Sequence, residues 1–183
     1  ILRVEHYQIQ PGITRVSPFA FDFYPYSHSL LAAVLWGIGF GAVYYARRRN
    51  LAGAIVLGLA VLSHWVLDLI VHRPDLPLGV TGSTRLGLGL WNSVPGTILV
   101  EGAIFVAGVA LYLWATRAKD RRGRWGLWTL LAFLVITYAS QFAGTPPPSN
   151  PVALGVFSLV LEGILVVWGY WVDAHRESAP GPV

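Results

Sequence analysis

The stretch Leu51–His72, LAGAIVLGLAVLSHWVLDLIVH, decides the fold class of this chain. It is long and apolar enough to cross the hydrocarbon core of a bilayer, which takes about 20 mostly apolar residues. Yet His64, Asp68 and His72 interrupt it at intervals of four residues. Ionisable groups within a membrane span are rare, costly and usually functional. We therefore predict a transmembrane helix that carries a polar site.

The composition of the whole chain supports this interpretation. Of its 183 residues, 55% are hydrophobic and only 12% are charged, whereas a soluble domain carries roughly 25% charged residues. The absence of cysteine excludes disulfides, thiolate zinc sites and Cys nucleophiles. The chain also lacks Met and begins at Ile1, from which we expect further residues upstream. The net charge of +4 comes from basic residues at the ends of the spans, so we expect membrane lipids and no nucleic acid as partners.

Five segments qualify as spans, and we expect an all-α, polytopic bundle of about five transmembrane helices. The expected helices cover residues 29–46, 51–72, 93–115, 125–142 and 151–172. Pro74 cannot continue the second helix, and Asn92 or Ser93 offers an N-cap for the third. Seven glycines are expected to be points of close packing between helices: Gly37, Gly39, Gly41, Gly58, Gly155, Gly163 and Gly169.

Lys and Arg predict the orientation, because cytoplasmic loops carry an excess of both. Nine of the 13 fall on one side of five alternating spans: Arg47, Arg48, Arg49, Arg117, Lys119, Arg121, Arg122, Arg124 and Arg176. The other side receives Arg3, Arg15, Arg73 and Arg85. We therefore expect an outer-face loop segment at 1–27, a transmembrane bundle at 28–173 and a frayed cytoplasmic tail at 174–183. The Pro-rich turn at 145–151 would face outward.

His64 and Asp68 are one helical turn apart, so their side chains share a face. They could bind one metal ion together, or Asp68 could orient His64. Neutral imidazole and carboxylate ligands suit Zn²⁺, Fe²⁺ or Mn²⁺. Three protein ligands and a water would make a hydrolytic site, because the metal lowers the pKa of that water to about 7. The alternative is a hydrogen-bonded pair that joins helices without any metal.

Other ionisable residues have less support from their spacing. Glu101 lies as deep as His64, roughly 12 Å from the outer surface, and is a candidate for the general base or a fourth ligand. Glu162 lies near the middle of the fifth helix and is either functional or neutral and hydrogen-bonded to a neighbouring helix. His72 has turned about 80° away from His64 and is expected to be an exposed residue at the helix end; it would be a third ligand only if the helix end bends inward. The carboxylates of Asp22 and Asp75 are expected to be solvated.

Two stretches resemble a known family. YPYSHSLL (Tyr24–Leu31) is similar to a motif of the bacterial inner-membrane proteins called membrane-bound metal-dependent hydrolases, the LexA-binding hydrolase-like family. Leu57–Leu78 resembles the second block of that family, with a Ser-His pair and an Asp four residues on, and Leu88–Gly102 resembles an uncharacterised small branch. The resemblance covers roughly residues 22–102.

This resemblance implies that His28, His64 and Asp68 bind a divalent metal such as zinc in a bacterial inner membrane. The family pattern also has a Gly-His pair in an earlier helix and acidic ligands before the SHS block. Neither is clear in this sequence, although Asp22 stands near the acidic position. We therefore expect one more span upstream of this chain.

Three hypotheses of function follow. The first is a metal-dependent hydrolase that acts on a lipid or another amphiphile from the outer leaflet, with Glu101 as its general base. The second is a non-catalytic accessory subunit of a larger membrane complex, because no complete catalytic constellation is present. The third is a proton or ion path through Asp68, Glu101 and Glu162, although five spans without repeat symmetry fit transporters poorly.

Overall fold

The computed structural model describes residues 5–81, 84–143 and 150–179. Arg3, most of the expected Pro-rich turn at 145–151 and the end of the expected tail lie outside these residues. The chain divides into two compact units, an N-terminal unit, Leu2–Thr97, and a C-terminal unit, Ile98–Val183. Helix α4 (Val94–Ala115) begins in the first unit and continues through the second.

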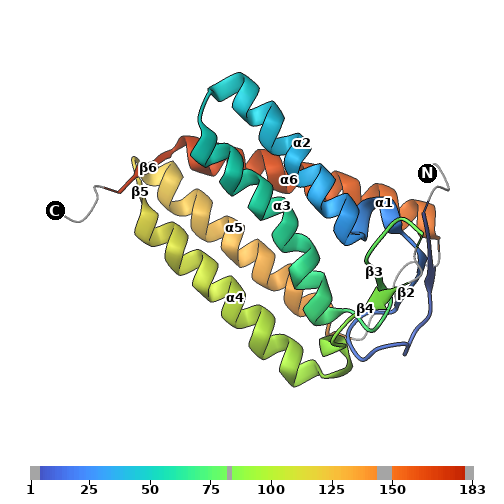
Figure 1. Ribbon diagram of the computed structural model, residues 1–183. Coiled ribbons are helices and arrows are strands. Elements are labelled where there is room, and N and C mark those ends of the chain that lie inside the picture. Colours follow the sequence, from blue (N-terminus) through green and yellow to red (C-terminus); the bar gives the residue numbers. More distant parts are fainter. Residues whose placement is uncertain (1–4, 82–83, 144–149, 180–183) are drawn as a thin grey trace. The chain divides into compact units, whose positions relative to one another are not determined.

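Two antiparallel helices and a cap of short strands form the N-terminal unit (Figure 1). Its helices are α1 (Pro25–His28), α2 (Leu30–Arg48), α3 (Leu51–Val71) and a 3₁₀ turn at Leu90–Asn92. Strand β1 (His6–Ile9) pairs with β2 (Phe19–Phe23), and β3 (Leu76–Pro77) pairs with β4 (Arg85–Leu86). Side chains just before three helices cap them: Ser29 caps α2, Asn50 caps α3, and Ser93 accepts a hydrogen bond from Gly96 in the first turn of α4.

Helices α2 and α3 pack closely because small residues face each other along their contact. A Cβ atom on Gly37 would lie 2.8 Å from the carbonyl oxygen of Gly58, and one on Gly41 would lie 2.9 Å from that of Ala54. Such small residues let helix backbones approach within a membrane, where no hydrophobic effect drives helices together. The close packing predicted for Gly37, Gly41 and Gly58 is therefore confirmed.

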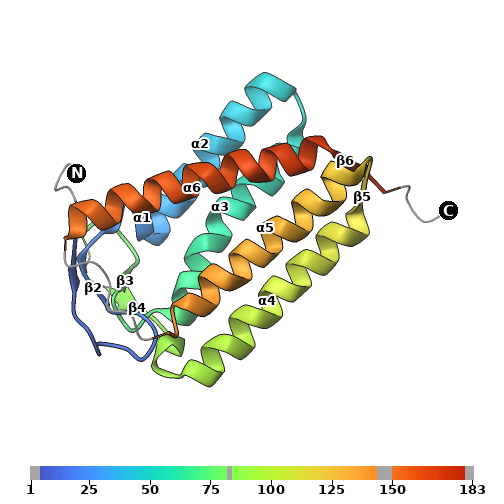
Figure 2. The ribbon, with the colours of Figure 1, turned by 180° about the vertical axis from the view of Figure 1, so that it is seen from behind.

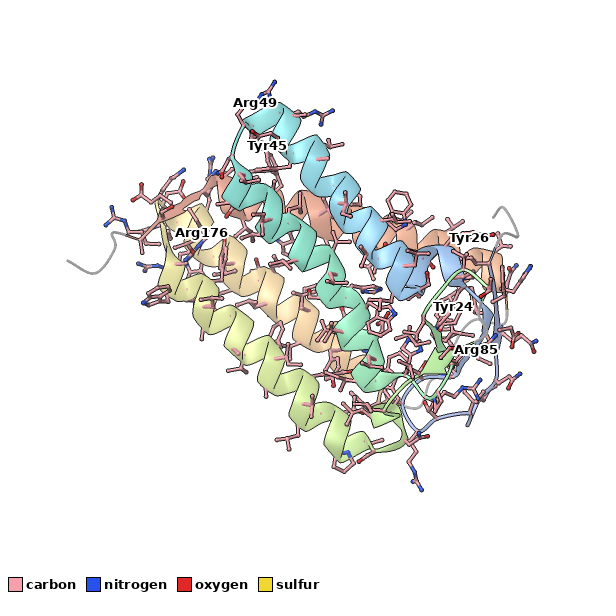
Figure 3. The ribbon with its side chains drawn as sticks, in the orientation of Figure 1. Tyr24, Tyr26, Tyr45, Arg49, Arg85 and Arg176 are labelled. Carbon is pink, nitrogen blue, oxygen red and sulfur yellow. The ribbon has the colours of Figure 1, made fainter. Side chains whose placement is uncertain are left out.

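Strands β1, β2, β3 and β4 lie at the end of the α2–α3 hairpin that is opposite to Arg49. Tyr45 and Arg49 mark one end of the hairpin, and Tyr24 and Arg85 mark the other (Figure 3). A small core at that second end contains Tyr24, Ala33, Trp65 and Leu76, with Phe21 packed against it. The cap is therefore anchored on both helices rather than resting loosely on the surface.

The C-terminal unit consists of α4, α5 (Arg121–Ser140) and α6 (Pro151–Ala174), closed by a two-stranded sheet. In Figure 2, α4 and α5 lie side by side; α4 ends and α5 begins next to that sheet, which is formed by β5 (Thr116–Ala118) and β6 (Arg176–Ser178). Asp120 accepts a hydrogen bond from the backbone of Gly123, so α5 begins four residues earlier than predicted.

Arg176 holds this sheet against the helices. Its buried guanidinium donates hydrogen bonds to the hydroxyl and carbonyl of Thr116 and to the carbonyl of Gly123. It also lies over the ring of Tyr112, 5.2 Å from the centroid. The prediction of a frayed tail from 174 onward is therefore wrong for the described part, because strand pairing and a buried cation hold residues 176–178 in place.

The prediction of a chain dominated by long apolar helices is confirmed. Four helices in the described part are long and apolar enough to cross a membrane: α2, α3, α4 and residues 152–174 of α6. Helix α5 is also 20 residues long, but arginines in its first turn lower its hydropathy. The fold is mostly helical but not all-α as expected, because short β-strands cap both units. The close packing predicted for Gly39, Gly155, Gly163 and Gly169 is wrong, since a Cβ atom on any of them would meet no atom within 4 Å.

Candidate metal centre

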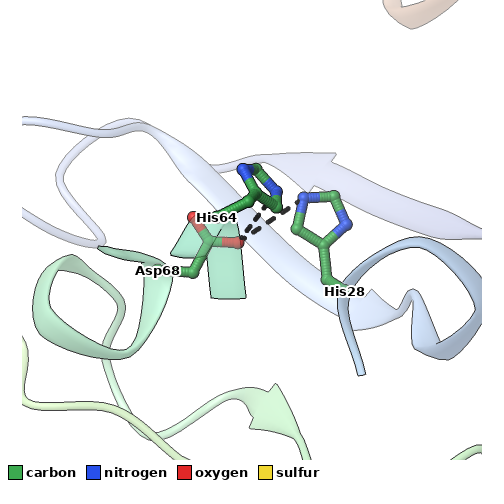
Figure 4. A group of neighbouring side chains, drawn as sticks. All are labelled: His28, His64 and Asp68. Carbon is green, nitrogen blue, oxygen red and sulfur yellow. Dashed lines mark ion pairs between the residues drawn. The ribbon is translucent and has the colours of Figure 1, made fainter. Parts of the chain in front are cut away.

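The end of α3 and the start of α2 bring three predicted ligands together. His28 is the last residue of α1, immediately before Ser29, whose side chain caps α2. His64 and Asp68 lie on the last two turns of α3. Because α2 and α3 are antiparallel, the start of one adjoins the end of the other. All three side chains point toward one another in Figure 4.

Asp68 lies between the two imidazoles. Its Oδ2 atom is 3.2 Å from Nε2 of His64 and 3.8 Å from Nε2 of His28, and the three ligand atoms all lie within 4.8 Å of one another. The side chain of Asp68 is 13% exposed, that of His28 28% and that of His64 58%. The group is thus closed on the Asp68 side and open on the His64 side.

The Asp68 Oδ2 atom is buried and receives no hydrogen bond from the described residues. The Nε2 atom of His64 lies near enough for an ion pair with Asp68 when His64 is protonated, but no hydrogen bond joins the two side chains. A buried carboxylate oxygen that accepts no hydrogen bond is costly. Zinc bonds of 2.0–2.1 Å in a tetrahedral site place neighbouring ligand atoms roughly 3.3 Å apart. The distances around Asp68 therefore suit a small divalent cation.

The second ring nitrogen of His28 is also engaged. Ser27 Oγ lies 2.6 Å from His28 Nδ1 and donates a hydrogen bond of 2.5 Å to Glu5 Oε2. The other oxygen of Glu5 accepts hydrogen bonds from the backbone nitrogens of Tyr26 and Ser27. Burial lowers the pKa of His28, against the opposing effect of Asp68. This direction favours a neutral imidazole, which is the form that binds metals.

A second polar cluster is buried beside the three ligands and does not match the predictions. His72 is 3% exposed and Asp75 is 4% exposed. His72 Nδ1 lies 3.0 Å from Asp75 Oδ1, which also accepts a hydrogen bond from Tyr24. Arg73 donates to the other oxygen of Asp75. The expectations of an exposed His72 and a solvated Asp75 are therefore wrong, because the strand cap covers this end of α3.

The pKa values of Asp75 and Tyr24 are both shifted in this cluster. Burial tends to raise the pKa of Asp75, but hydrogen bonds from His72 and Arg73 outweigh it and hold the pKa below its usual value. Burial, followed by the charge of Asp75, raises the pKa of Tyr24. Asp75 is therefore a charged acceptor at neutral pH, and Tyr24 is a neutral donor.

An aromatic wall connects the two clusters. The rings of Phe21 and Tyr24 lie 6.4 and 5.1 Å from that of His28, and 5.0 and 6.1 Å from that of His72, measured between centroids. Trp91 covers His72 from another side at 4.7 Å. Phe21 of β2 and Tyr24, which precedes α1, therefore both shape the site.

The remaining candidates are not part of the three-residue group. Glu101 belongs to the C-terminal unit, where it interacts with Tyr138 of α5, so its role as general base stays a prediction. Glu162 is exposed on α6, and Asp22 accepts a hydrogen bond from Gln8 at the surface. Glu5 and Ser27 had no sequence signal, because 22 positions separate them and only the fold of the strand cap brings them together.

No family model, curated protein or solved structure matches the chain.

Proposed function

We propose that this chain is a membrane protein that binds a divalent cation of the zinc type through His28, His64 and Asp68, and that it is a metal-dependent hydrolase. The observation that carries the proposal is the buried Oδ2 atom of Asp68, which faces two imidazole nitrogens without a hydrogen bond. Two nitrogens and one oxygen form a ligand set typical of zinc and of other first-row divalent metals.

The reaction class follows from the number of ligands. Three protein ligands leave a position open for water, whose pKa a bound zinc lowers to about 7. The open position would lie on the exposed His64 side of the group. His28, His64 and Asp68 would hold the cation, and Phe21 and Tyr24 would exclude water from the His28 side. An amphiphile that reaches the site from the membrane is the substrate class we favour.

The experiment is to measure metal per chain by mass spectrometry after purification through a tag that contains no histidine. We expect one equivalent in the wild type, and a loss of at least tenfold in affinity for His64→Ala and Asp68→Ala, because each removes one of three ligands. His6→Ala removes an imidazole from the exposed strand β1 and serves as the control. A wild type without stoichiometric metal, even after incubation with Zn²⁺, would show that the three residues only join helices.

The proposal includes five spans with the site on the outer face. Within the C-terminal unit, α4 and α6 both end at the β5–β6 sheet, since Thr116 pairs with Ser178. If α4 and α6 cross the bilayer, the chain between them must return across it. Helix α5 is the described helix in this interval, and its 20 residues extend about 30 Å, the thickness of the hydrocarbon core. The excess of Lys and Arg would place the sheet in the cytoplasm.

One observation favours the alternative of an accessory subunit. Glu162 lies at the middle of α6 and is exposed, and no hydrogen bond or ion pair involves it among the described residues. Within 152–174, only Val172 is buried. Charged side chains within a membrane usually face protein rather than lipid. A partner helix that donates a hydrogen bond to Glu162 would account for this exposure.

The two functions are separated by the mass of the protein extracted from its membrane in a mild detergent. A partner subunit would be retained by the wild type and lost from Glu162→Leu, whereas Tyr170→Leu changes another exposed residue of α6 and would leave the complex intact. A wild-type protein that is monodisperse, alone and loaded with metal would contradict the accessory role.

A further inference from the structure

We propose that Glu5, acting through Ser27, is a positioning residue that fixes the tautomer of His28, so that its Nε2 atom presents a lone pair to the cation. This inference rests on the proposed metal site. It adds to that site a chain of hydrogen bonds that begins at Glu5, in the N-terminal arm, which is the segment before β1. It assigns a role to two residues that do not touch the cation themselves.

The carboxylate of Glu5 is surrounded by hydrogen-bond donors. The two carboxylate oxygens of Glu5 lie within 2.5–2.9 Å of three donors, which are the backbone nitrogens of Tyr26 and Ser27 and the hydroxyl of Ser27. An ionised carboxylate can only accept, and all three contacts suit it. The single proton of the Ser27 hydroxyl is therefore directed at Glu5.

The tautomer of His28 follows from the direction of the hydrogen bond between Ser27 and Glu5. Because the hydroxyl proton of Ser27 is used in the hydrogen bond to Glu5, Ser27 Oγ can only accept a hydrogen bond from His28 Nδ1, which lies 2.6 Å away. His28 then carries its proton on Nδ1, and Nε2 faces Asp68 Oδ2 at 3.8 Å with a lone pair. Two lone pairs that face each other repel unless a cation lies between them. Histidine ligands of metals generally donate their other N–H in this manner, which orients the ring and raises its basicity.

The same hydrogen bonds tie the N-terminal arm to the site. No side chain of α1 itself caps that helix, and Glu5 fills this role from a position just before β1. Hydrogen bonds therefore connect Glu5, α1 and the ligand His28. Deleting the arm should weaken the site without removing any ligand.

The first test is Zn²⁺ affinity in competition with a chromophoric chelator. We expect Ser27→Ala to weaken binding 10- to 100-fold, the usual effect of losing the partner of a histidine ligand. Ser27→Thr keeps the hydroxyl and should bind within about threefold of the wild type. Asp22→Asn, which changes another carboxylate of the same cap, is the control and should bind like the wild type, because Asp22 contacts Gln8 rather than His28.

Glu5→Gln distinguishes positioning from simple stability. The amide oxygen of Gln would keep the two backbone donors, and its NH₂ group would then face Ser27 Oγ. Ser27 would be forced to donate to His28 Nδ1, which moves the ring proton to Nε2. We expect Glu5→Gln to bind Zn²⁺ at least as weakly as Ser27→Ala, with an unfolding temperature close to that of the wild type.

The second test does not depend on metal. Nitrogen-15 spectra of histidine-labelled protein, with the His28 signals assigned through His28→Gln, report which ring nitrogen carries the proton. We expect the Nδ1–H tautomer in the metal-free wild type and the Nε2–H tautomer in Glu5→Gln. An Nε2–H tautomer in the wild type would overturn the inference, as would Ser27→Ala binding Zn²⁺ as tightly as the wild type. Absence of metal from the wild type would instead overturn the proposed function, and the tautomer would still decide the role of Glu5.

Discussion

At the scale of single residues, the surroundings rather than the residue type decide what a carboxylate does. Asp68 and Asp75 both lie near the end of α3, and both are largely buried. Asp75 has three donors around it, from His72, Arg73 and Tyr24. Asp68 Oδ2 receives no hydrogen bond from the described residues and faces only the imidazole nitrogens of His64 and His28. Asp75 is therefore structural, and Asp68 is the carboxylate with capacity for a ligand.

Asp75→Asn is expected to destabilise the N-terminal unit by about 2–3 kcal/mol at neutral pH, because the amide NH₂ would oppose the donating Nε of Arg73. The folded pKa of Asp75 is lowered, so its charge contributes stability above the unfolded pKa of about 4. This contribution disappears as the pH falls through the lower folded pKa. The unfolding temperature of the wild type should therefore drop more steeply than that of Asp75→Asn below about pH 4. Parallel curves for the two proteins would contradict this assignment.

At the scale of elements, small residues set the distance between α2 and α3. Gly37 lies against the backbone of Gly58, so a side chain there meets a carbonyl group that cannot rotate away. Gly39 lies on the same helix, where a Cβ atom meets nothing within 4 Å. Because His28 and His64 come from the two sides of this hairpin, its spacing also sets the width of the site.

Gly37→Ala should push the helices apart and cost about 1–3 kcal/mol, the usual cost of overpacking. Gly39→Ala is the matched control and should be neutral or slightly stabilising, because alanine favours helices more than glycine does. Thermal unfolding in detergent measures both effects. The metal affinity of Gly37→Ala should fall as well, and equal behaviour of the two variants would show that the close contact is unimportant.

The β5–β6 sheet depends on a buried arginine more than on its exposed ion pair. Arg176→Ala removes three hydrogen bonds and the contact with Tyr112 and should cost about 2–3 kcal/mol. Arg117→Ala breaks only the exposed pair with Glu177, which is worth at most about 1 kcal/mol. Carboxypeptidase digestion should remove residues beyond 174 much faster from Arg176→Ala than from Arg117→Ala.

At the scale of the whole molecule, the absence of cysteine allows a direct test of topology. Single cysteines at Arg48 and Arg122 should react with a membrane-impermeant thiol reagent only from the cytoplasmic side. Cysteines at Val80 and Gln141 should react only from the opposite side, because α3 and α5 would each have crossed the bilayer. Labelling of Arg122→Cys and Gln141→Cys from the same side would show that α5 does not cross and that the five-span proposal is wrong.

The sequence by itself determined the helical class, the positions of the long helices and the pairing of His64 with Asp68. Hydrophobic length and i,i+4 spacing are local properties, and they require no knowledge of other segments. The prediction of His28 as a ligand came from a family resemblance, and the structure places its Nε2 atom 3.8 Å from Oδ2 of Asp68.

Only the tertiary structure decided which polar groups are buried and how they are connected. The strand cap covers His72 and Asp75, which the sequence had suggested were exposed, and it brings Glu5 to Ser27. These contacts join segments far apart in the chain, and no local pattern of hydrophobicity records them. Burial and hydrogen bonding are properties of the assembled fold, so a carboxylate that the sequence presents as solvated became the centre of a buried cluster.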